Sequence, residues 1–307
     1  MLAVDVGGTT VKAEVVDGCG RVLTSGATPT PSGPAALESV SRLGRGLLEQ
    51  VGAQRPVARA GLVLPGIVDR VRRIGVRSAN VGWSDLSFGP ELEASWRIPV
   101  LVDHDVTLAG WAEWRTGAGR GADDVVFVVL GTGISAALVV DGRLVRGGGG
   151  GGGPSGSGGQ AGELGHVVVR ADGPRCGCGG RGCLEAVASG SAIAREYARL
   201  AGREVDGAHD VLLALDDDPI ARRVWDDAVA ALADGVSAVV ALLAPSRIVF
   251  GGGLAEAGEA LIGPLRKALG ERVFVTPAPD LLPAHHGARA GLVGAALLAR
   301  LGGTDGG

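Results

Sequence analysis

The sequence has no apolar run approaching the roughly 18 residues that a membrane-spanning helix needs. It also has no run of five or more basic residues, and its only lysines are Lys12 and Lys267. The formal net charge is -4 at pH 7. These absences exclude a membrane-spanning protein and leave no electrostatic argument for binding to nucleic acid.

We expect no signal peptide at the N-terminus, because an acidic residue, Asp5, and two glycines follow Met1 almost at once. We therefore expect a soluble cytoplasmic protein, in which thiols stay reduced and disulfides are rare. At 307 residues the chain is long enough for two domains of ordinary size, and 46% apolar residues are enough for substantial cores.

Cysteine is also scarce, but its positions are informative. Three of the four cysteines, Cys176, Cys178 and Cys183, lie within eight positions, and His166 precedes them by nine intervening residues. Zn²⁺ prefers a tetrahedral set of thiolates and imidazole nitrogens. The spacing therefore predicts a structural metal site with His166 as the fourth ligand, whereas Cys19 is a lone thiol.

Two glutamates flank this cluster, Glu163 and Glu185. A metal-bound histidine uses one ring nitrogen for the ion, so its other nitrogen is a donor of fixed direction. Two carboxylates and an oriented imidazole suit a polyhydroxylated ligand. The alternative is that both glutamates cap helices or lie in solvent, and Glu185 would fit the first turn of a helix.

Two stretches share the pattern strand, glycine-threonine turn, strand. The first has strands at 2–6 and 11–17 around Gly7 to Thr10, and the second has strands at 124–130 and 134–140 around Gly131 to Gly133. Glycine lets backbone N–H groups approach a phosphate, and threonine hydroxyls donate as well. Neither turn is a Walker loop. Each alone is most simply a hairpin, but the repetition predicts duplicated domains that close on one nucleotide.

An acidic stretch follows another predicted strand, at 98–102. It reads Asp103-His104-Asp105 and leads into a predicted helix at 106–115. Phosphoryl transfer to a hydroxyl needs in-line positioning, a metal ion and a carboxylate that accepts the hydroxyl proton. Asp105 is the candidate base, and the alternative is that it only caps the helix.

The remaining pattern predicts an alternation of helices and strands. Helices are expected at 34–51, 185–200, 219–243, 257–269 and 288–301, and strands at 21–25, 57–64, 246–250 and 273–276. We expect an irregular loop at 78–83, a nucleotide-seating turn at Gly251 to Gly253 and a surface loop at His285-His286. The glycine tract 147–153 reads as a flexible low-complexity insertion.

The pattern E-x-G-H followed by C-x-C-G-x-x-G-C-x-E resembles the ROK family of sugar kinases and sugar-responsive repressors, and the resemblance extends over nearly the whole chain. It implies an actin-like ATPase (ribonuclease H-like) α/β fold with two duplicated domains and an interdomain cleft. The expected domains are residues 1–106 with a C-terminal helix at about 288–307, and residues 107–287 with the zinc-binding loop.

The resemblance also implies roles for individual residues. A structural Zn²⁺ would be held by His166, Cys176, Cys178 and Cys183. The sugar would be contacted by Gly66, Asn80, His104, Asp105, Glu163, His166 and Glu185, with Asp105 as the catalytic base. ATP and Mg²⁺ would be bound by Asp5, Gly7, Gly8, Thr9, Thr10, Lys12, Gly131, Thr132, Gly133, Gly251, Gly252 and Gly253, with Asp5 holding Mg²⁺ through water.

Two positions depart from the family pattern. His104 stands where the family usually has an asparagine that contacts the sugar, and Ser135 stands where glycine is frequent. The first departure leaves the sugar open, and the second affects the geometry of the second phosphate turn.

The resemblance implies ATP-dependent phosphorylation of a hexose, with glucose to glucose 6-phosphate as the expected reaction in carbohydrate metabolism and glycolysis. The alternatives are an N-acetylhexosamine kinase, a fructokinase or a non-enzymatic sugar sensor. Family repressors carry an N-terminal helix-turn-helix, for which the phosphate hairpin at residue 2 leaves no room. The acidic balance and the C-x-C spacing disfavour a zinc module that binds nucleic acid. We also expect a homodimer or homotetramer.

Overall fold

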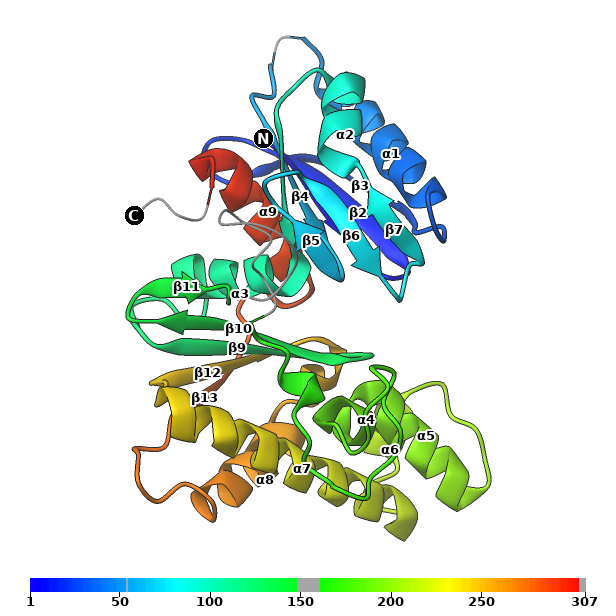
Figure 1. Cartoon of the computed structure of the whole chain (residues 1–307), viewed down its shortest axis with the longest axis vertical. Helices are drawn as coiled ribbons and strands as arrows, with labels where there is room; N and C mark the ends of the chain where they lie inside the picture. Colours follow the sequence, from blue (N-terminus) through cyan, green and yellow to red (C-terminus); the bar gives the residue numbers. More distant parts are fainter. Residues whose placement is uncertain (54, 148–160, 304–307) are drawn as a thin grey trace. The chain divides into compact units, whose positions relative to one another are not determined.

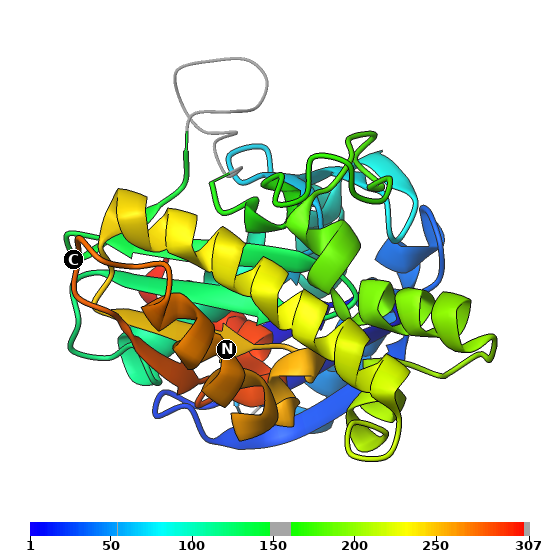
Figure 2. The same cartoon turned by 90° about the horizontal axis from the view of Figure 1, so that it is seen from below.

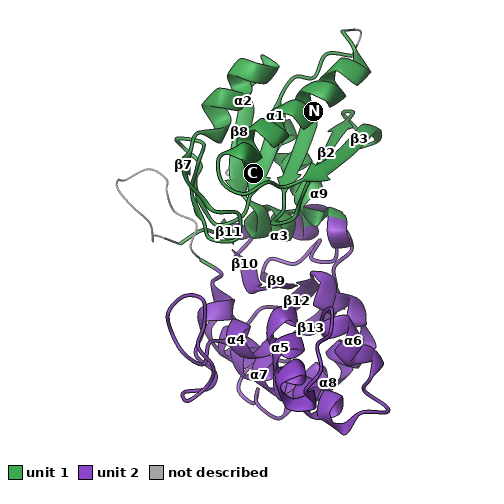
Figure 3. Ribbon diagram, turned by 90° about the vertical axis from the view of Figure 1, so that its right-hand side faces the viewer, with its two compact units in different colours: residues 1–112, 144–161, 289–307 green, residues 113–143, 162–288 purple. Residues whose placement is uncertain are grey.

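The computed structural model describes residues 1–53, 55–147 and 161–303 (Figure 1). The chain divides into two compact units (Figure 3). Unit 1 comprises residues 1–112, 144–161 and 289–307, and unit 2 comprises residues 113–143 and 162–288. The division at residues 106 and 287 that the sequence suggested stays a prediction.

Unit 1 contains a five-stranded sheet with the order β3-β2-β1-β4-β8. Antiparallel pairing joins β1 (Leu2–Val6), β2 (Thr10–Val16) and β3 (Val22–Pro29). The other two strands, β4 (Ala60–Leu64) and β8 (Val100–His104), run parallel to β1. Because β1, β4 and β8 are parallel, their carboxyl ends lie at one edge of the sheet.

Helices cover both faces of this sheet (Figure 1). On one face, α1 (Ala35–Val51) and α2 (Phe88–Trp96) pack into an apolar core with alternate residues of β1 and β4. On the other face, α9 (Ala290–Leu301) approaches so closely that a Cβ at Gly61 would lie 2.0 Å from the Ala295 carbonyl oxygen. Glycine is therefore required at position 61.

A second, smaller sheet in unit 1 was not expected from the sequence. It consists of β5 (Ile67–Asp69), β6 (Ile74–Ser78) and β7 (Trp83–Leu86), all antiparallel. The predicted loop at 78–83 is the tight turn between β6 and β7, closed by a hydrogen bond from the Gly82 amide to the Ser78 carbonyl. Trp83 and Phe88 stack edge to face beneath this sheet.

Helix α3 (Asp105–Thr116) begins directly after β8, and its last four residues belong to unit 2. Glu113 on this helix is fully buried, yet its carboxylate accepts hydrogen bonds from three backbone amides, those of Ala118, His285 and His286. A buried carboxylate needs such donors, so Glu113 fixes the 285–286 segment to α3.

A second five-stranded sheet repeats the strand pattern of the first, with the order β11-β10-β9-β12-β13, and lies in unit 2 except for Leu144 and Val145 of β11. The strands β9 (Val125–Leu130) and β10 (Ile134–Val140) form an antiparallel hairpin, and β11 (Arg143–Val145) extends it. Parallel pairing adds β12 (Arg247–Gly251) and β13 (Asp280–Pro283). This repetition confirms the predicted duplicated α/β fold.

Helices pack on one face of this sheet and form the second apolar core. The longest, α7 (Pro219–Leu243), begins at an N-cap whose side chain, Asp218, accepts amide hydrogen bonds from Ile220 and Ala221. Figure 2 shows α7 lying across the sheet of unit 2. The others are α4 (Leu184–Ala188), α5 (Gly190–Ala201), α6 (Ala208–Leu213) and α8 (Glu259–Gly270). No helix in the described ranges is long and apolar enough to cross a membrane.

Two predictions for unit 2 were wrong. The strand expected at 273–276 is irregular, and the side chains of Phe274 and Val275 are 81% and 98% exposed. The last strand is instead β13, whose Leu281 pairs with Ile248 of β12. The single helix expected at 185–200 is two helices, because Ser189 adopts an extended backbone and caps α5 by accepting a hydrogen bond from the Ala192 amide.

Candidate active site

The carboxyl edge of the parallel strands in unit 1 carries most of its predicted site residues. In the sheet, Asp5 of β1 pairs with Val63 of β4, and Leu64 of β4 pairs with His104 of β8. Asp5 and His104 therefore lie at similar heights on β1 and β8, the two strands that flank β4. Asp105 directly follows His104. Parallel α/β sheets place ligands at this edge.

The first glycine-threonine turn connects β1 to β2 at the same edge. The Gly7 amide donates to the Thr10 carbonyl at 3.0 Å, and a Cβ at Gly7 would lie 2.9 Å from that oxygen. The Thr30 hydroxyl holds the turn from outside by donating to the Gly7 carbonyl at 2.8 Å. Gly8 and Thr9 are exposed, so the tip of the turn is accessible to a phosphate.

Asp5 is a carboxylic acid in an unfavourable place for a negative charge. Burial, and secondarily the nearby Asp105, raises the pKa of Asp5 to about 7, while Lys12 across the hairpin opposes the shift. Gly291 of α9 leaves the room for this carboxylate, because a Cβ there would lie 2.4 Å from Asp5 Oδ2. A cation beside Asp5 would stabilise its ionised form.

Asp105 starts α3, and its side chain is 28% exposed. Its Oδ1 accepts a hydrogen bond from the Val106 amide at 2.7 Å and lies 3.2 Å from His104 Nε2. Burial raises the pKa of Asp105, and His104 opposes the shift. An accessible carboxylate with a raised pKa suits a general base.

The backbone that leads to Asp105 is fixed by a buried ion pair. Asp103 is 1% exposed and accepts two hydrogen bonds from the Arg146 guanidinium, at 2.9 and 2.7 Å. Asp103 Oδ1 also accepts a hydrogen bond from the His104 amide at 2.8 Å. Such a two-point pair is geometrically specific, so Arg146 orients the segment that carries the candidate base.

Gly66 and Asn80 are brought together by the small sheet. Gly66 has a φ of 92°, and a Cβ there would lie 2.3 Å from the Arg77 carbonyl oxygen. Only glycine fits this close approach. Asn80 lies exposed in the turn that follows β6, three residues after Arg77. Both positions are thus accessible at neighbouring points of unit 1.

In unit 2, the predicted metal ligands converge. One ligand atom from each of His166, Cys176, Cys178 and Cys183 lies within 4.8 Å of every other. The Cys178 and Cys183 sulfurs are 3.7 Å apart, as are the Cys176 sulfur and His166 Nδ1. Ligands of a tetrahedral zinc site lie about 3.5–3.8 Å from one another. The geometry and the donor types therefore fit Zn²⁺.

His166 places Nδ1 among the converging ligand atoms, and its Nε2 lies 3.6 Å from Glu163 Oε2. Glu163 is positioned by Gly162, which packs so closely on β10 that a Cβ there would lie 1.9 Å from the Ala136 carbonyl oxygen. The Glu163 side chain is 51% exposed. It can therefore accept a hydrogen bond from a ligand hydroxyl.

Glu185 occupies the first turn of a helix, α4, as one of the two interpretations of its position predicted, and its contact with the sugar stays a prediction. Its Oε2 accepts a hydrogen bond from the Ile134 amide at 2.9 Å. A Cβ at Gly133 would lie 2.4 Å from the same oxygen. Glu185 thus joins the metal-binding loop to the second glycine-threonine turn.

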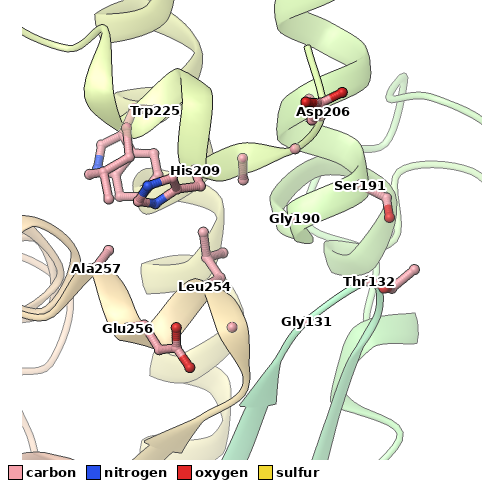
Figure 4. A pocket seen from close by; sticks show the side chains of 15 residues that line it. Gly131, Thr132, Gly190, Ser191, Asp206, His209, Trp225, Leu254, Glu256 and Ala257 are labelled. Atoms are coloured by element: carbon pink, nitrogen blue, oxygen red, sulfur yellow. The ribbon is translucent and has the colours of Figure 1, made fainter. Parts of the chain in front are cut away.

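A cavity of about 710 Å³ opens beside that turn, entirely within unit 2 (Figure 4). Thr132 and Ser191 lie on one side of it, and His209, Trp225 and Leu254 lie on the other. The start of α5 is tied to the turn, because the Gly190 amide donates to the Gly131 carbonyl at 2.8 Å. A helix N-terminus and a glycine turn at one end favour phosphate groups there.

The cavity contains only part of the predicted nucleotide set. Of the residues proposed from the second and third glycine clusters, Gly131, Thr132 and Gly253 line it. Gly133 faces Glu185, Gly251 packs against Phe127, and Gly252 turns the chain with a φ of 86°. These three glycines therefore do not line the cavity.

Sequence reasoning missed the other residues that line the cavity. They are Gly190, Ser191, Ala194, Asp206, Gly207, Ala208, His209, Leu212, Trp225, Leu254, Glu256 and Ala257. The one local signal was Ser189 before Gly190, a favoured N-cap. The 15 residues that line the cavity include Asp206 and Glu256 but no lysine or arginine.

A family model described as "ROK family" matches residues 1–301. The chain is 32% identical to a glucokinase from Streptomyces coelicolor over 322 residues, covering 97% of each chain. It is 32% identical to an N-acetylmannosamine kinase from Citrobacter koseri over 303 residues, covering 97% of this chain and 98% of that one. Among solved structures, it is similar to a ROK family glucokinase from Streptomyces griseus in complex with glucose and AMPPNP. That TM-score is 0.82 at 31% identity, and 98% and 99% of the two chains are covered.

Proposed function

The chain belongs to the ROK family and is a sugar kinase of the hexokinase type, and we propose that it transfers the γ-phosphoryl group of ATP to the 6-hydroxyl of glucose. The observation that carries this proposal is the partly exposed Asp105 carboxylate at the edge of a sheet whose strands also carry Asp5 and the first phosphate turn.

The unit 2 cavity supports a nucleotide as the phosphoryl donor. Apolar and aromatic groups such as Trp225 and Leu254 suit a base, and the Asp206 and Glu256 carboxylates suit ribose hydroxyls. Inorganic polyphosphate would need a row of cationic side chains, which the lining residues do not include. We therefore favour ATP over polyphosphate.

In the proposed reaction, the oxygen of the sugar hydroxyl bonds to the γ-phosphorus while Asp105 accepts the proton of that hydroxyl. ADP leaves with the electrons of the broken P–O bond. Glu163, His166 and Glu185 would hydrogen-bond other sugar hydroxyls, and Gly66 and Asn80 would contribute backbone and amide contacts. Asp5 would hold Mg²⁺, which supplies charge neutralisation to the phosphates.

Structural Zn²⁺ is the metal we propose for the ligand cluster of unit 2. The set of three thiols and one imidazole is the closed type that binds zinc structurally. With Nδ1 on the metal, His166 would present its Nε2–H to a sugar hydroxyl or to Glu163. The ion would thus order the loop that contacts the sugar.

N-acetylmannosamine is the second candidate substrate. The similarity to the Citrobacter koseri enzyme is as extensive as that to the glucokinase, and His104 replaces an asparagine that the family uses at the sugar. We also propose a cytoplasmic location and a homodimeric or homotetrameric assembly.

A coupled ADP-release assay over glucose, N-acetylglucosamine, N-acetylmannosamine, fructose and mannose tests the proposal, and direct measurement of sugar-phosphate formation compares ATP with polyphosphate as donors. We expect the largest kcat/KM with glucose and ATP. A larger kcat/KM for N-acetylmannosamine would identify that sugar, and not glucose, as the substrate. A lack of turnover with every sugar would overturn the proposed function.

A further inference from the structure

We infer that Asp234 of α7 is a positioning residue for the metal loop, residues 166–183. Its carboxylate holds the Arg170 side chain, and through Arg170 it holds the place where the loop begins and ends. The inference rests on the zinc site and the sugar contacts proposed for this loop. It gives a role in sugar binding to a helix that the sequence did not connect with the site.

The two ends of the metal loop lie side by side in the backbone. The Val169 and Arg170 amides both donate to the Gly182 carbonyl, at 2.9 and 3.1 Å. A Cβ at Gly182 would lie 1.5 Å from the Arg170 carbonyl oxygen, so the two backbone segments are in direct contact. The position of Arg170 therefore fixes the position of Gly182, and with it the next residue, the predicted ligand Cys183.

The guanidinium of Arg170 is bound by α7. Its Nη1 donates to Asp234 Oδ2 at 2.5 Å and to the Val169 carbonyl at 2.7 Å. The side chain is thus held from two directions, by the carboxylate of α7 and by the loop backbone. A displacement of the loop backbone at residues 169 and 170 would therefore break the contact with Asp234.

A second arginine fixes the Asp234 carboxylate itself. Arg272 Nε donates to Asp234 Oδ1 at 2.6 Å, and Arg272 Nη1 donates to the Ala268 carbonyl of α8 at 2.8 Å. Each carboxylate oxygen thus accepts a charge-assisted hydrogen bond from a different arginine. Gly235, the next residue of α7, lies against Leu184, because a Cβ there would be 2.7 Å from Leu184 Cδ2. Helix α7 therefore supports the chain near the start of the metal loop and directly after its end.

The exposure of these side chains indicates which property they affect. Asp234, Arg170 and Arg272 are between 27% and 39% exposed, and ion pairs in such positions contribute little to global stability. A loop whose ends are already in position loses less conformational entropy when its ligands converge on a metal ion. Asp234 should therefore affect zinc affinity and sugar binding, and hardly affect kcat.

Zinc affinity tests this directly, by competition with a chromophoric chelator. Arg170→Met keeps the aliphatic part of the side chain and leaves the Asp234–Arg272 pair intact, so it changes the least. We expect Arg170→Met and Asp234→Ala each to raise the Kd for zinc about three- to tenfold. The double variant should bind zinc no more weakly than the weaker single variant, because both changes break the same contact. Glu196→Ala, which breaks the ion pair with Arg199 on α5, is the matched control and should leave the Kd unchanged.

Two further measurements use the zinc-loaded protein. Both single variants should raise KM for glucose about three- to tenfold and leave kcat within about twofold of wild type, because the chemical step is unchanged. The amides of residues 169 and 170 should exchange faster with solvent, as NMR would show. Arg272→Met retains the contact between Asp234 and Arg170 and should have a smaller effect on each quantity.

A purely structural role gives a different pattern. Lower urea midpoints for both variants, with an unchanged zinc Kd and an unchanged KM for glucose, would overturn the inference. Additive losses of zinc affinity in the double variant would also contradict it, since Asp234 would then not act through Arg170. The zinc titration and the amide exchange need neither sugar nor ATP. If the wild type phosphorylates no sugar, the proposed function fails, but these two measurements still decide the role of Asp234.

Discussion

The base segment of unit 1, residues 103–107, and the metal loop of unit 2, residues 166–183, are held in different ways. In the base segment the chain itself supplies each contact: the Arg146 guanidinium donates two hydrogen bonds to Asp103, the Thr107 hydroxyl hydrogen-bonds His104 Nδ1, and the Val106 amide donates to Asp105. In the metal loop the chain supplies four converging ligand atoms, and we propose that a zinc ion holds them together.

The cysteines show why the metal loop depends on a cation. Burial raises the pKa of the Cys183 thiol to about 12, with the neighbouring Cys178 and Cys176 adding to the shift. Three adjacent thiolates repel one another unless a metal compensates their charge. The base segment should therefore keep its structure without metal, and the metal loop should lose it. Loss of the base would then abolish phosphoryl transfer, whereas loss of the metal would abolish sugar binding.

Removal of the base should have the largest effect. We expect Asp105→Ala to lower kcat about 100- to 10,000-fold, because general base catalysis contributes a factor of about this size. Steady-state kinetics with glucose and ATP measure it. Asp216→Ala, whose side chain is 94% exposed in unit 2, is the control. Retention of more than a tenth of the wild-type rate would exclude Asp105 as the base.

Removal of the metal should have the next largest effect. A strong chelator, or Cys183→Ala at a buried ligand, should release zinc, lower activity at least tenfold and expose the 166–183 amides to hydrogen exchange. Cys19→Ala, at the exposed thiol outside the cluster, should leave zinc content and activity unchanged. A zinc-free preparation with full activity would contradict the account.

A smaller effect concerns the stability of unit 1 as a function of pH. The folded pKa of Asp5, about 7, is above its unfolded value of 3.8, so the native state binds more protons between these values. Without Mg²⁺, this residue should therefore reduce the free energy of unfolding as pH rises from about 4 to 7. The reduction is at most about 4 kcal/mol, since each pKa unit corresponds to about 1.4 kcal/mol.

Urea unfolding in a magnesium-free buffer measures this difference. Asp5→Asn should be more stable than wild type at pH 8 and lose the advantage toward pH 4. Asp17→Asn provides the opposite case, because hydrogen bonding to the Arg21 amide holds the pKa of Asp17 below its usual value. That variant should be less stable at pH 8. Parallel stability profiles for wild type and Asp5→Asn would refute the assignment.

The smallest effect is expected for the glycine tract, most of which lies outside the described residues. The Ala161 amide donates a hydrogen bond to the Arg146 carbonyl at 3.2 Å, so the two residues that flank the tract lie side by side. Its length should then not affect Glu163 or His166. Deletion of residues 148–152 should leave KM for glucose within about twofold of wild type, as glucose saturation curves would show. A large rise in KM would mean that the tract takes part in sugar binding.

The elements that the sequence predicted correctly depend on local patterns. The two hairpins follow from glycine and threonine between apolar runs, and the metal cluster follows from ligands close together in sequence. The strand at 273–276 was wrong because Phe274 and Val275 form an apolar run that is exposed. Apolar character alone did not show that the pairing partner of β12 begins at Asp280.

The parts of the site that the sequence missed depend on distant contacts. Arg146 and Asp103 are 43 residues apart, and Gly291 makes room for Asp5 across almost the entire chain. The cavity combines residues from the second glycine-threonine turn, the start of α5 and the segment before α6. No local spacing rule links such positions, because only the order of the strands brings them together.

Calorimetric titration of glucose into wild-type protein, Asp105→Ala and zinc-depleted protein tests the central claim most directly. The account predicts that Asp105→Ala binds glucose within about tenfold of the wild-type Kd, whereas zinc-depleted protein shows no measurable binding. Loss of glucose binding in Asp105→Ala, together with intact binding without zinc, would contradict it.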